Sequence, residues 1–314
     1  MTDEATLSPS APGMALETVG SSGNGGEPEI LVRATAAEVS ATAAERIVAG
    51  LGVAIQERGE AHFVTTGGST PIGIYDLLSS NLRDRIDWTR VHFWWGDDRY
   101  VPRDHPLSNV QAADAILFGS AQFSGQSGNQ TEGIDIQVGL EPGLVVPIEN
   151  IHPFRCGEAI ANGLGAGWCA QQYGQELRGA GLPEARGLPV FDVFLLGLGP
   201  DGHFLSVFPG SAALDTDAWA LAIPAPTHVE PHVPRVTLNP AIPGVARSVL
   251  MVTGGRAKAD IVGEIFHSER DARRLPAQLV RRPGATWILD VEAAQNIPDV
   301  AAPGVRPGLR SASD

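Results

Sequence analysis

An aspartate and a histidine two positions apart on a glycine-rich segment are the residues of this 314-residue chain best suited to catalysis. Asp201 and His203 belong to the sequence Gly-Leu-Gly-Pro-Asp-Gly-His, which begins where an apolar run over residues 190–197 ends. A neutral imidazole can take a proton from water, and a neighbouring carboxylate can set its tautomer and orientation. The pair predicts general acid–base catalysis; the alternative is a histidine whose hydrogen bonds are satisfied within the core.

A second segment, Thr-Gly-Gly-Ser-Thr-Pro at residues 66–71, has the composition of an anion-binding loop. Its glycines let the backbone approach a ligand, its hydroxyl groups can donate hydrogen bonds, and Pro71 suits the first position of a helix, whose N-terminus attracts phosphate. The alternative is a tight turn in which Thr70 caps the helix. No lysine follows at the spacing of a Walker A loop. The residues predicted to bind phosphate here are Gly67, Gly68, Ser69 and Thr70.

Three basic residues are further candidates for binding an anionic ligand. Arg99 follows the apolar run 91–95 and can bind phosphate through two N–H groups. Lys258, the only lysine, falls in the first turn of a predicted helix, where an ammonium is unfavourable unless an anion lies nearby. Arg235, the third, begins the segment Arg-Val-Thr-Leu at residues 235–238. The alternatives are that Arg99 only pairs with Asp98 and that Lys258 is solvated.

Three other signatures are weak or missing, which argues against a bound dinucleotide, a zinc site and a serine nucleophile. Residues 197–202 match the dinucleotide pattern G-x-G-x-x-G, but Pro209 and Gly210 interrupt the region and no acidic residue clearly follows at the required distance. His228 and His232 have the spacing of metal ligands, but the surrounding prolines forbid the helix that would put both on one face. The serine-nucleophile pattern G-x-S-x-G is absent from the sequence.

The pattern of strands and helices predicts how these segments are positioned. Apolar runs typical of buried strands cover residues 61–66, 91–95, 190–197, 248–253 and 285–289. Helical patterns alternate with them over residues 35–59, 71–78, 108–118, 157–178 and 256–267. This alternation predicts a Rossmann-like, doubly wound α/β fold in a single large domain, with a mostly parallel sheet flanked by helices on both faces. Ligands of such folds bind beyond the carboxyl ends of the strands, where the candidate segments lie.

Both ends of the chain and one internal stretch are predicted to lie outside this domain. Residues 1–27 and 303–314 are rich in small and polar residues, and they carry too few large apolar side chains to offset the entropy of ordering them. The Gly/Gln/Ser-rich stretch 119–145 is predicted to be an inserted surface loop. The domain itself is predicted to span residues 28–302.

Composition limits the partners and the compartment. The chain has 22 basic and 36 acidic residues, a formal charge of −14, which argues against nucleic acid or an anionic membrane as a partner. It has no long apolar run that would predict a membrane span, and its acidic N-terminus differs from a secretory signal. Cys156 and Cys169 are expected to be free thiols in a reducing compartment. We therefore expect a cytoplasmic protein.

Six segments, in this order, resemble the 6-phosphogluconolactonases, which belong to a larger group with sugar-phosphate isomerases and glucosamine-6-phosphate deaminases. Within that group, the deaminases typically continue from Asp-Gly-His towards Asn-Glu-Pro, whereas this chain has Ser-Val-Phe-Pro-Gly at residues 206–210. Phe204 and Leu205 are bulkier than the family pattern, but they leave the polar residues intact. The matching segments are residues 65–71, 96–109, 197–210, 235–238, 254–258 and 276–290.

The resemblance implies hydrolysis of 6-phospho-D-glucono-1,5-lactone to 6-phosphogluconate in the oxidative pentose phosphate pathway, without a cofactor. The enzyme would be a carboxylic ester hydrolase. We expect His203 to take a proton from water and return it to the leaving ring oxygen, while Asp201 orients the imidazole. Backbone N–H groups near Gly67–Gly68 or around Gly199–Gly202 are the candidate oxyanion donors.

The resemblance also implies which residues bind the phosphate at the other end of the substrate. Arg99, Lys258 and the loop of residues 67–70 should hold the phosphate, with Arg235 as a further contact. The expected partner is therefore a small sugar-phosphate lactone bound by a monomer or a weak homo-oligomer. Two other functions stay open: an amino-sugar-phosphate deaminase or isomerase on the same scaffold, and a non-catalytic sugar-phosphate sensor, which the low basic content disfavours.

Overall fold

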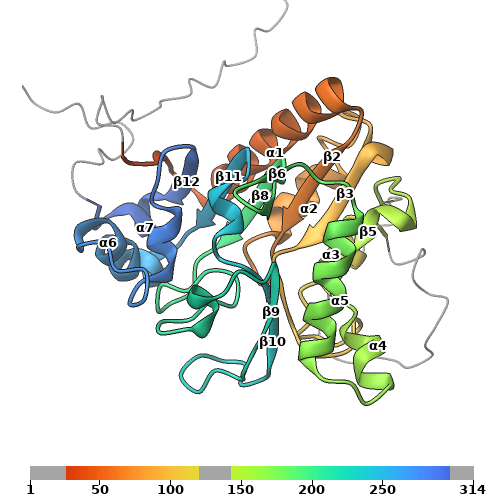
Figure 1. Cartoon of the computed structure of the whole chain (residues 1–314). Coiled ribbons are helices and arrows are strands. Elements are labelled where there is room, and N and C mark those ends of the chain that lie inside the picture. The colour runs from red at the N-terminus through yellow and green to blue at the C-terminus, as the bar shows by residue number, and fades with distance from the viewer. Residues whose placement is uncertain (1–25, 120–142, 298–314) are drawn as a thin grey trace, which may run out of the picture.

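A seven-stranded sheet, parallel at every pairing, forms the centre of the chain (Figure 1). The structure is a computed structural model that describes residues 26–119 and 143–297. Helices cover both faces of the sheet, which confirms the predicted doubly wound α/β fold. In spatial order the strands are β1 (Glu29–Arg33), β12 (Ala285–Asp290), β11 (Ser248–Thr253), β8 (Val193–Gly197), β2 (Ala61–Thr65), β3 (Val91–Trp95) and β5 (Ile151–His152).

The helices form a layer on each face of this sheet. They are α1 (Ala36–Arg58), α2 (Ile72–Ser79), α3 (Gln111–Ile116), α4 (Cys156–Ala161), α5 (Ala166–Gly179), α6 (Ala259–His267) and α7 (Val291–Ala294). On one face, Gly50 of α1 lies so close to Val193 of β8 that a Cβ atom would come within 2.7 Å of the valine Cγ2. On the other face, Trp94 of β3 packs edge-to-face against Tyr173 of α5, with ring centroids 5.9 Å apart. The sheet is therefore buried on both sides, as its apolar strands predicted.

The long helix α1 begins and ends at residues that cap it. The Thr35 hydroxyl accepts a hydrogen bond from the backbone N–H of Glu38 at 3.2 Å, and the Glu38 carboxylate accepts one from the N–H of Ala34 at 2.8 Å. These bonds form a capping box, except that the glutamate reaches one residue further back than in the usual arrangement. Gly59 ends the helix with a φ of 86°, a conformation that a glycine adopts without strain.

Two elements of the central layers differ from the prediction. The helical pattern over residues 157–178 forms two helices, α4 and α5, because Gly163 turns the chain with a φ of 66° between them. Helix α2 begins at Ile72, with Pro71 at the N-cap and without a side-chain cap. Thr70 therefore does not cap this helix, contrary to the alternative reading of its loop. Strands β1 and β5 at the sheet edges were not predicted.

A second, smaller sheet is the largest feature that the sequence pattern did not predict. It is antiparallel, and Figure 1 shows β9 and β10 side by side, projecting from the main sheet. Its first strand continues directly from β3 beyond Gly96, whose carbonyl accepts the N–H of Leu238 at 2.8 Å. The two sheets are therefore joined at the carboxyl end of β3. The strands of the smaller sheet are, in spatial order, β4 (Asp97–Arg99), β10 (Arg235–Leu238) and β9 (Ala220–Ile223).

The order of the strands creates a switch point between β2 and β8. From β2 the chain adds β3 and β5 on one side, and from β8 it adds β11 and β12 on the other side. At such a point the connections leave in opposite directions and open a crevice at the carboxyl ends of the two strands. The segments that begin at Thr66 and at Gly197 follow these two strands.

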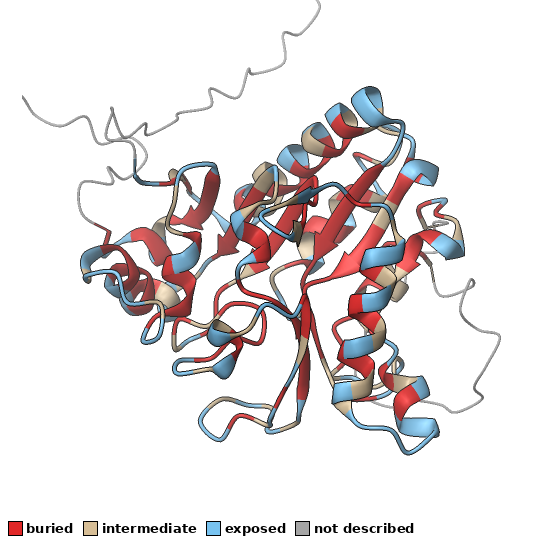
Figure 2. Cartoon of the chain, viewed as in Figure 1, coloured by how far each residue is buried: buried red, intermediate tan, exposed pale blue. Residues whose placement is uncertain are grey.

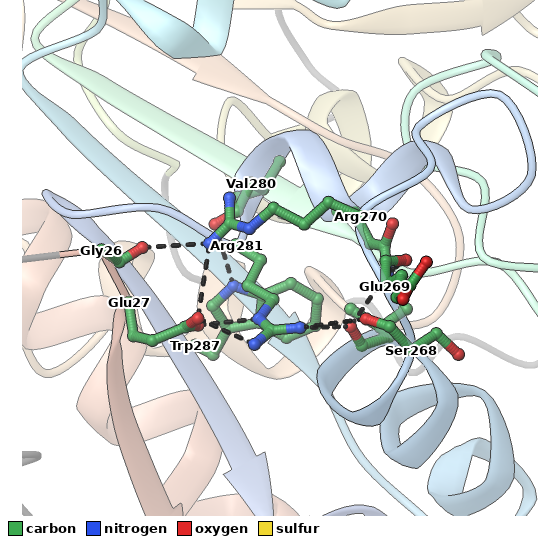
Figure 3. A network of polar contacts seen from close by, with 10 residues as sticks. Gly26, Glu27, Ser268, Glu269, Arg270, Val280, Arg281 and Trp287 are labelled. Carbon is green, nitrogen blue, oxygen red and sulfur yellow. Dashed lines mark hydrogen bonds and ion pairs between the residues drawn. The ribbon is translucent and has the colours of Figure 1, made fainter.

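The first described residues contact the body of the molecule. The Glu27 carboxylate accepts two hydrogen bonds of 2.7 Å from the Arg281 guanidinium and lies 3.4 Å from Arg270 (Figure 3). The hydrogen bond from Arg281 lowers the pKa of the Glu27 carboxyl. Glu27, which composition assigns to the N-terminal tail, thus pairs with the folded body. Most of the predicted tails and loop lies at residues 1–25, 120–142 and 298–314, outside the described residues.

The core lies between the sheet and its helices, and Figure 2 shows the strands buried along their length. Cys156 and Cys169 are buried free thiols whose Sγ atoms lie 3.5 Å apart, between α4 and α5. The structural roles of the two thiols are therefore those of small apolar side chains in the core.

Across the described residues, none of the helices has both the length and the apolar character needed to span a bilayer.

Candidate active site

Four loops meet at the carboxyl edge of the parallel sheet. They follow β2, β3, β8 and β11, and they carry the segments singled out from the sequence. A Cβ on Gly197 at the end of β8 would lie 3.6 Å from the Thr70 hydroxyl, so the loops after β8 and β2 are in contact. Two of the glycine-containing segments singled out from the sequence therefore meet at the switch point.

The Asp201–His203 pair is built into a closed turn after β8. The Gly199 N–H donates to the His203 carbonyl at 2.8 Å, and a Cβ on Gly199 would lie 2.0 Å from His203 Nδ1. Only glycine fits there, because the imidazole packs directly on its Cα. His203 Nδ1 lies 2.5 Å from Asp201 Oδ1, and the His203 N–H donates to the same oxygen at 3.2 Å. With its Nδ1–H directed at a carboxylate, the ring presents Nε2 as its basic nitrogen.

Asp201 is ionised under a wide range of conditions. Burial raises the pKa of its carboxyl, but the hydrogen bonds and charge of His203 and the hydrogen bond of His228 outweigh burial and hold that pKa well below its usual range. His228 Nε2 lies 2.8 Å from Asp201 Oδ2, on the oxygen that His203 does not use. The carboxylate therefore has an imidazole on each side. From the sequence, His228 was a candidate only as a metal ligand, because no local pattern indicates its contact with Asp201.

Lys258 connects the loop after β11 to the same turn. Its Nζ donates a 2.7 Å hydrogen bond to the Leu198 carbonyl. Burial lowers the pKa of the Lys258 ammonium, and the charge of Asp201 opposes that effect. The residue is the N-cap of α6, one position before the first residue of the helix, whereas the prediction placed it within the first turn. It is half-buried, so the alternative of a fully solvated lysine is wrong.

Arg99 and Arg235 lie directly opposite each other on neighbouring strands of the smaller sheet. They are register partners of the antiparallel strands β4 and β10. Burial, followed by the charge of Arg99, lowers the pKa of the Arg235 guanidinium. Like charges directly opposite in a sheet are unfavourable, so an anion between them would stabilise the pair.

The partners of these two guanidiniums are backbone carbonyls. Arg235 donates to Pro231 O at 3.0 Å and to Val233 O at 3.3 Å, and Arg99 donates to Leu107 O at 2.8 Å. Among the described residues, neither forms an ion pair with a carboxylate, and Arg99 Nε is buried without a partner. The arrangement therefore leaves positive charge available for a ligand.

The alternative that Arg99 only pairs with Asp98 is wrong. The buried Asp98 carboxylate accepts hydrogen bonds from the backbone N–H groups of Arg99 and Asn109, at 2.8 and 2.7 Å. It also accepts one from the Ser108 hydroxyl at 3.2 Å. Asp98 thus holds the shape of the loop after β3 and leaves the guanidinium of Arg99 without a carboxylate partner.

Asn109 joins the loops after β2 and β3. Its Nδ2 donates to the Asp97 carbonyl at 2.9 Å, and a Cβ on Gly67 would lie only 1.8 Å from its Oδ1. Asp97 Oδ2 accepts a 2.5 Å hydrogen bond from the Ser206 hydroxyl of the loop after β8. These buried contacts fix three loops relative to one another. The sequence analysis missed the roles of Asn109 and Ser206, because nothing local indicates which loops they join.

Phe208 lies between the acid–base pair and the arginines. Its buried ring lies 4.6 Å from the His203 ring and 5.8 Å from the His228 ring. The guanidinium carbon of Arg235 lies 5.8 Å from its centroid. The structure therefore brings His203 and Arg235 close to the same aromatic side chain, which places the candidate base and a candidate anion-binding residue in one region.

The two sets of candidate oxyanion donors differ in whether their backbone N–H groups already have hydrogen-bond partners. Gly199 and Gly202 donate their N–H groups to carbonyls within the turn, at 2.8 and 3.3 Å. The N–H groups of Gly67 and Gly68 remain candidates. Gly68 has a φ of 78°, and it and Ser69 are exposed, so this loop presents its backbone at the surface of the crevice.

The weaker motifs do not form the sites their patterns describe. After β8 the chain makes a turn and a short bridge between Phe204 and Val207 instead of the helix that a dinucleotide-binding loop requires. His232 Nδ1 contacts the Pro226 carbonyl at 2.7 Å, whereas His228 contacts Asp201, so the two histidines have different partners. Among residues 26–119 and 143–297, His, Cys, Asp and Glu side chains form no group of three or more that could hold a metal ion.

Comparisons with known proteins agree with this geometry. A family profile described as glucosamine-6-phosphate isomerases/6-phosphogluconolactonase matches residues 34–289. A curated 6-phosphogluconolactonase from Synechocystis sp. is 33% identical over 245 residues, which cover 78% of this chain and 88% of that protein. The solved 6-phosphogluconolactonase of Trypanosoma brucei has a TM-score of 0.68 at 28% identity and covers 86% of this chain and 99% of its own.

A more distant structure shares the fold alone. A monomeric glucosamine-6-phosphate deaminase has a TM-score of 0.61 at 16% identity and covers 85% of this chain and 99% of its own. The scaffold therefore occurs with more than one activity, and the residues of the site have to decide between them. The matched range of the family profile contains every candidate site residue.

Proposed function

Because this chain belongs to the glucosamine-6-phosphate isomerase/6-phosphogluconolactonase family, we propose that it hydrolyses 6-phospho-D-glucono-1,5-lactone to 6-phosphogluconate. The reaction is a step of the oxidative pentose phosphate pathway. The observation that carries the proposal is the Asp201–His203 pair, 2.5 Å apart, next to Phe208, whose ring also lies close to Arg235, one of two adjacent arginines without carboxylate hydrogen-bond partners among the described residues. A general base and a group of cationic side chains in one region suit a substrate with an ester at one end and a phosphate at the other.

His203 acts first as a base and then as an acid. Its Nε2 takes a proton from water as the water oxygen adds to C1 of the lactone, and it returns that proton to the ring oxygen as the C1–O bond breaks. Asp201, ionised and bonded to Nδ1, keeps the proton of the neutral ring on Nδ1 and stabilises the imidazolium. The N–H groups of Gly67 and Gly68 are the proposed donors to the tetrahedral oxyanion.

The phosphate is bound by positive charge from three elements. Arg99 and Arg235 provide guanidinium groups from β4 and β10, and Lys258 provides an ammonium at the start of α6. Ser69 and Thr70 add hydroxyl groups from the loop after β2. Charge-assisted hydrogen bonds of this kind are roughly twice as strong as neutral ones, so they account for retention of a small anionic substrate. We also propose that a monomer or weak homo-oligomer performs this reaction in the cytoplasm.

The decisive experiment compares the wild type with His203→Ala on freshly generated 6-phosphogluconolactone in a pH-stat or coupled assay. We expect kcat to fall about 10²–10⁴-fold, with KM changed by less than about threefold, because the variant loses proton transfer and keeps the phosphate site. An unchanged kcat would refute the assignment of His203.

Two controls separate the other functions. Ammonia release from glucosamine-6-phosphate would identify a deaminase. Binding of 6-phosphogluconate in a calorimeter, without lactone hydrolysis above the spontaneous rate, would identify a sugar-phosphate sensor.

A further inference from the structure

The loop between β9 and β10, residues 224–234, brings a second imidazole to the candidate site. We infer that His228 is a positioning residue, which fixes the Asp201 carboxylate and, through it, the imidazole of His203. This inference rests on the proposed lactone hydrolysis, in which the orientation of His203 determines the rate. His228 is not required to touch the substrate for this role.

The first support is that the two oxygens of Asp201 have separate partners. Oδ1 bonds the Nδ1 of His203 at 2.5 Å and its backbone N–H at 3.2 Å, while Oδ2 bonds His228 Nε2 at 2.8 Å. The terminal torsion of an aspartate side chain is broad, so a bond to one oxygen alone leaves the carboxylate plane poorly defined. A partner on the second oxygen sets that plane. In this respect His228 resembles the outer-shell partners that orient a functional histidine elsewhere.

The second support is that Phe208 gives both imidazoles the same packing surface. The His203 ring is tilted by 52° on Phe208, and the His228 ring meets Phe208 edge-on, with an interplanar angle of 81°. Phe208 itself is buried. Although the His228 side chain is 51% exposed, its ring is therefore placed by a hydrogen bond at one end and by an aromatic contact along its side.

The third support is that the loop carrying His228 is held by the proposed phosphate site. Arg235 donates to the carbonyl of Pro231 at 3.0 Å and to that of Val233 at 3.3 Å. Four prolines in the loop restrict its φ angles and so lower the entropy lost when it is ordered. His228 is thus presented to Asp201 by a segment that is bonded to Arg235, and the two ends of the site are connected through it.

The same loop contains a matched control. His232 is four residues from His228 and is similarly exposed, with 48% of its side chain accessible. Its Nδ1 contacts the Pro226 carbonyl at 2.7 Å and its Nε2 lies 3.1 Å from Glu230, so its ring contacts neither Asp201 nor Phe208. Replacing this histidine tests the loop without altering the carboxylate.

The test uses three variants of the full chain in the lactonase assay. His228→Phe keeps an aromatic ring but removes the donor, His228→Gln keeps an amide donor, and His232→Gln is the control. We expect kcat of His228→Phe to fall about fivefold to tenfold, the net worth of one hydrogen bond at a half-exposed side chain, with KM changed by less than about twofold. His228→Gln should recover kcat to within about twofold of wild type, and His232→Gln should match wild type.

A second measurement reports on the geometry without any turnover. In ¹⁵N-histidine-labelled protein, the proton on His203 Nδ1 should give a strongly downfield resonance, because it is bonded to a carboxylate. We expect that resonance to move upfield or broaden in His228→Phe and to stay in place in His228→Gln. The melting temperatures of all variants should stay within about 2 °C of wild type, since His228 is half exposed.

The outcomes distinguish the inference from the proposed function. If wild type hydrolyses the lactone and His228→Phe matches it in both kcat and the His203 resonance, the positioning role is wrong. Equal losses of kcat in His228→Phe and His228→Gln would also overturn it. The inference requires that a side chain with a hydrogen-bond donor at position 228 restores kcat. If wild type shows no hydrolysis, the proposed function fails, and the resonance alone then decides whether His228 orients His203.

Discussion

At the scale of single residues, the candidate site contains charges that the protein alone does not neutralise. Arg99 and Arg235 face each other in register, and their guanidinium partners among the described residues are carbonyl oxygens. Asp98, the nearest carboxylate in sequence, is used instead by backbone N–H groups. Paired like charges lower stability, and the charges of Asp97 and Asp98 oppose this effect at Arg235 only in part, so this arrangement is expected where a ligand supplies further negative charge.

We therefore predict that Arg99→Gln weakens substrate binding and leaves the stability of the protein nearly unchanged. Losing one charged contact to phosphate should raise KM for the lactone about 10–100-fold, while kcat changes by less than about threefold. The melting temperature of the ligand-free variant should stay within about 3 °C of wild type, because relief of charge repulsion offsets the lost bond to Leu107. Steady-state kinetics and calorimetry measure both quantities.

The control for this prediction is Arg85→Gln, which removes an arginine from an exposed ion pair. It should leave KM unchanged. Inorganic phosphate should raise the melting temperature of wild type and of Arg85→Gln more than that of Arg99→Gln. A KM for Arg99→Gln equal to that of wild type would show that Arg99 does not bind the substrate.

At the scale of elements, the site depends on contacts between loops that leave no room for a side chain. Gly67, in the loop after β2, packs against Asn109 of the loop after β3. Asn109 is in turn bonded to Asp97 of β4. The smaller sheet and the loop after β2 are therefore positioned relative to each other by one buried amide, whose Oδ1 has no hydrogen-bond partner among the described residues.

Gly67→Ala should disturb this junction. Its Cβ would lie 1.8 Å from Asn109 Oδ1, so the two loops would have to move apart. We expect a loss of about 1–3 kcal/mol in the free energy of unfolding and a fall of at least about tenfold in kcat/KM. Urea unfolding and lactone hydrolysis measure the two effects.

A matched glycine should respond in the opposite direction. Gly167 lies in the exposed first turn of α5, where an added Cβ would meet no heavy atom within 4 Å. Gly167→Ala should raise the unfolding free energy by up to about 1 kcal/mol and leave activity unchanged, because alanine favours the helix. If both substitutions behaved alike, the effect at residue 67 would not come from the contact with Asn109.

At the scale of the whole molecule, the junction of the two sheets makes stability depend on pH. Burial raises the pKa of Asp98 to about 7, and hydrogen bonds from Asn109 and Arg99 only partly oppose it. The unfolded carboxyl has its ordinary pKa of about 4, so between these values the folded state binds more protons than the unfolded state. The contribution of Asp98 is thus most favourable at low pH and is lost as pH rises through about 4–7.

Asp98→Asn should remove this dependence. Asparagine can keep the two backbone bonds through Oδ1 and donate to Ser108 from Nδ2, and it stays neutral. We expect the variant to be more stable than wild type by on the order of 2–4 kcal/mol at pH 8, with a smaller difference at pH 5. Urea unfolding followed by tryptophan fluorescence at both pH values gives the comparison.

The exposed Asp84 supplies the control, since Asp84→Asn should change stability little at either pH. An Asp98→Asn variant that is less stable than wild type at pH 8 would show that the ionised carboxylate stabilises the junction. The basic groups of Arg99 and Arg235 would then be its partners.

The sequence by itself determined the central layers, because their signals are local. The apolar runs that form β2, β3, β8, β11 and β12 and the capped pattern of α1 indicate their own conformation within a few residues. The family motifs likewise identified which polar residues follow which strands. The sequence did not predict the smaller sheet, since its short strands, such as Asp97–Arg99, lack a strand-like hydrophobic period. Nor did it predict that residues 157–178 form two helices.

Only the tertiary structure decided how the candidate residues are combined. The pairing of Arg99 with Arg235 depends on the register between strands more than a hundred positions apart, and the contact of His228 with Asp201 depends on the path of a proline-rich loop. Neither relation has a local pattern, because each is set by packing between distant segments. Sequence thus determined which groups could perform the chemistry, and the fold decided which of them meet, since hydrogen bonds and charges act through distance in space.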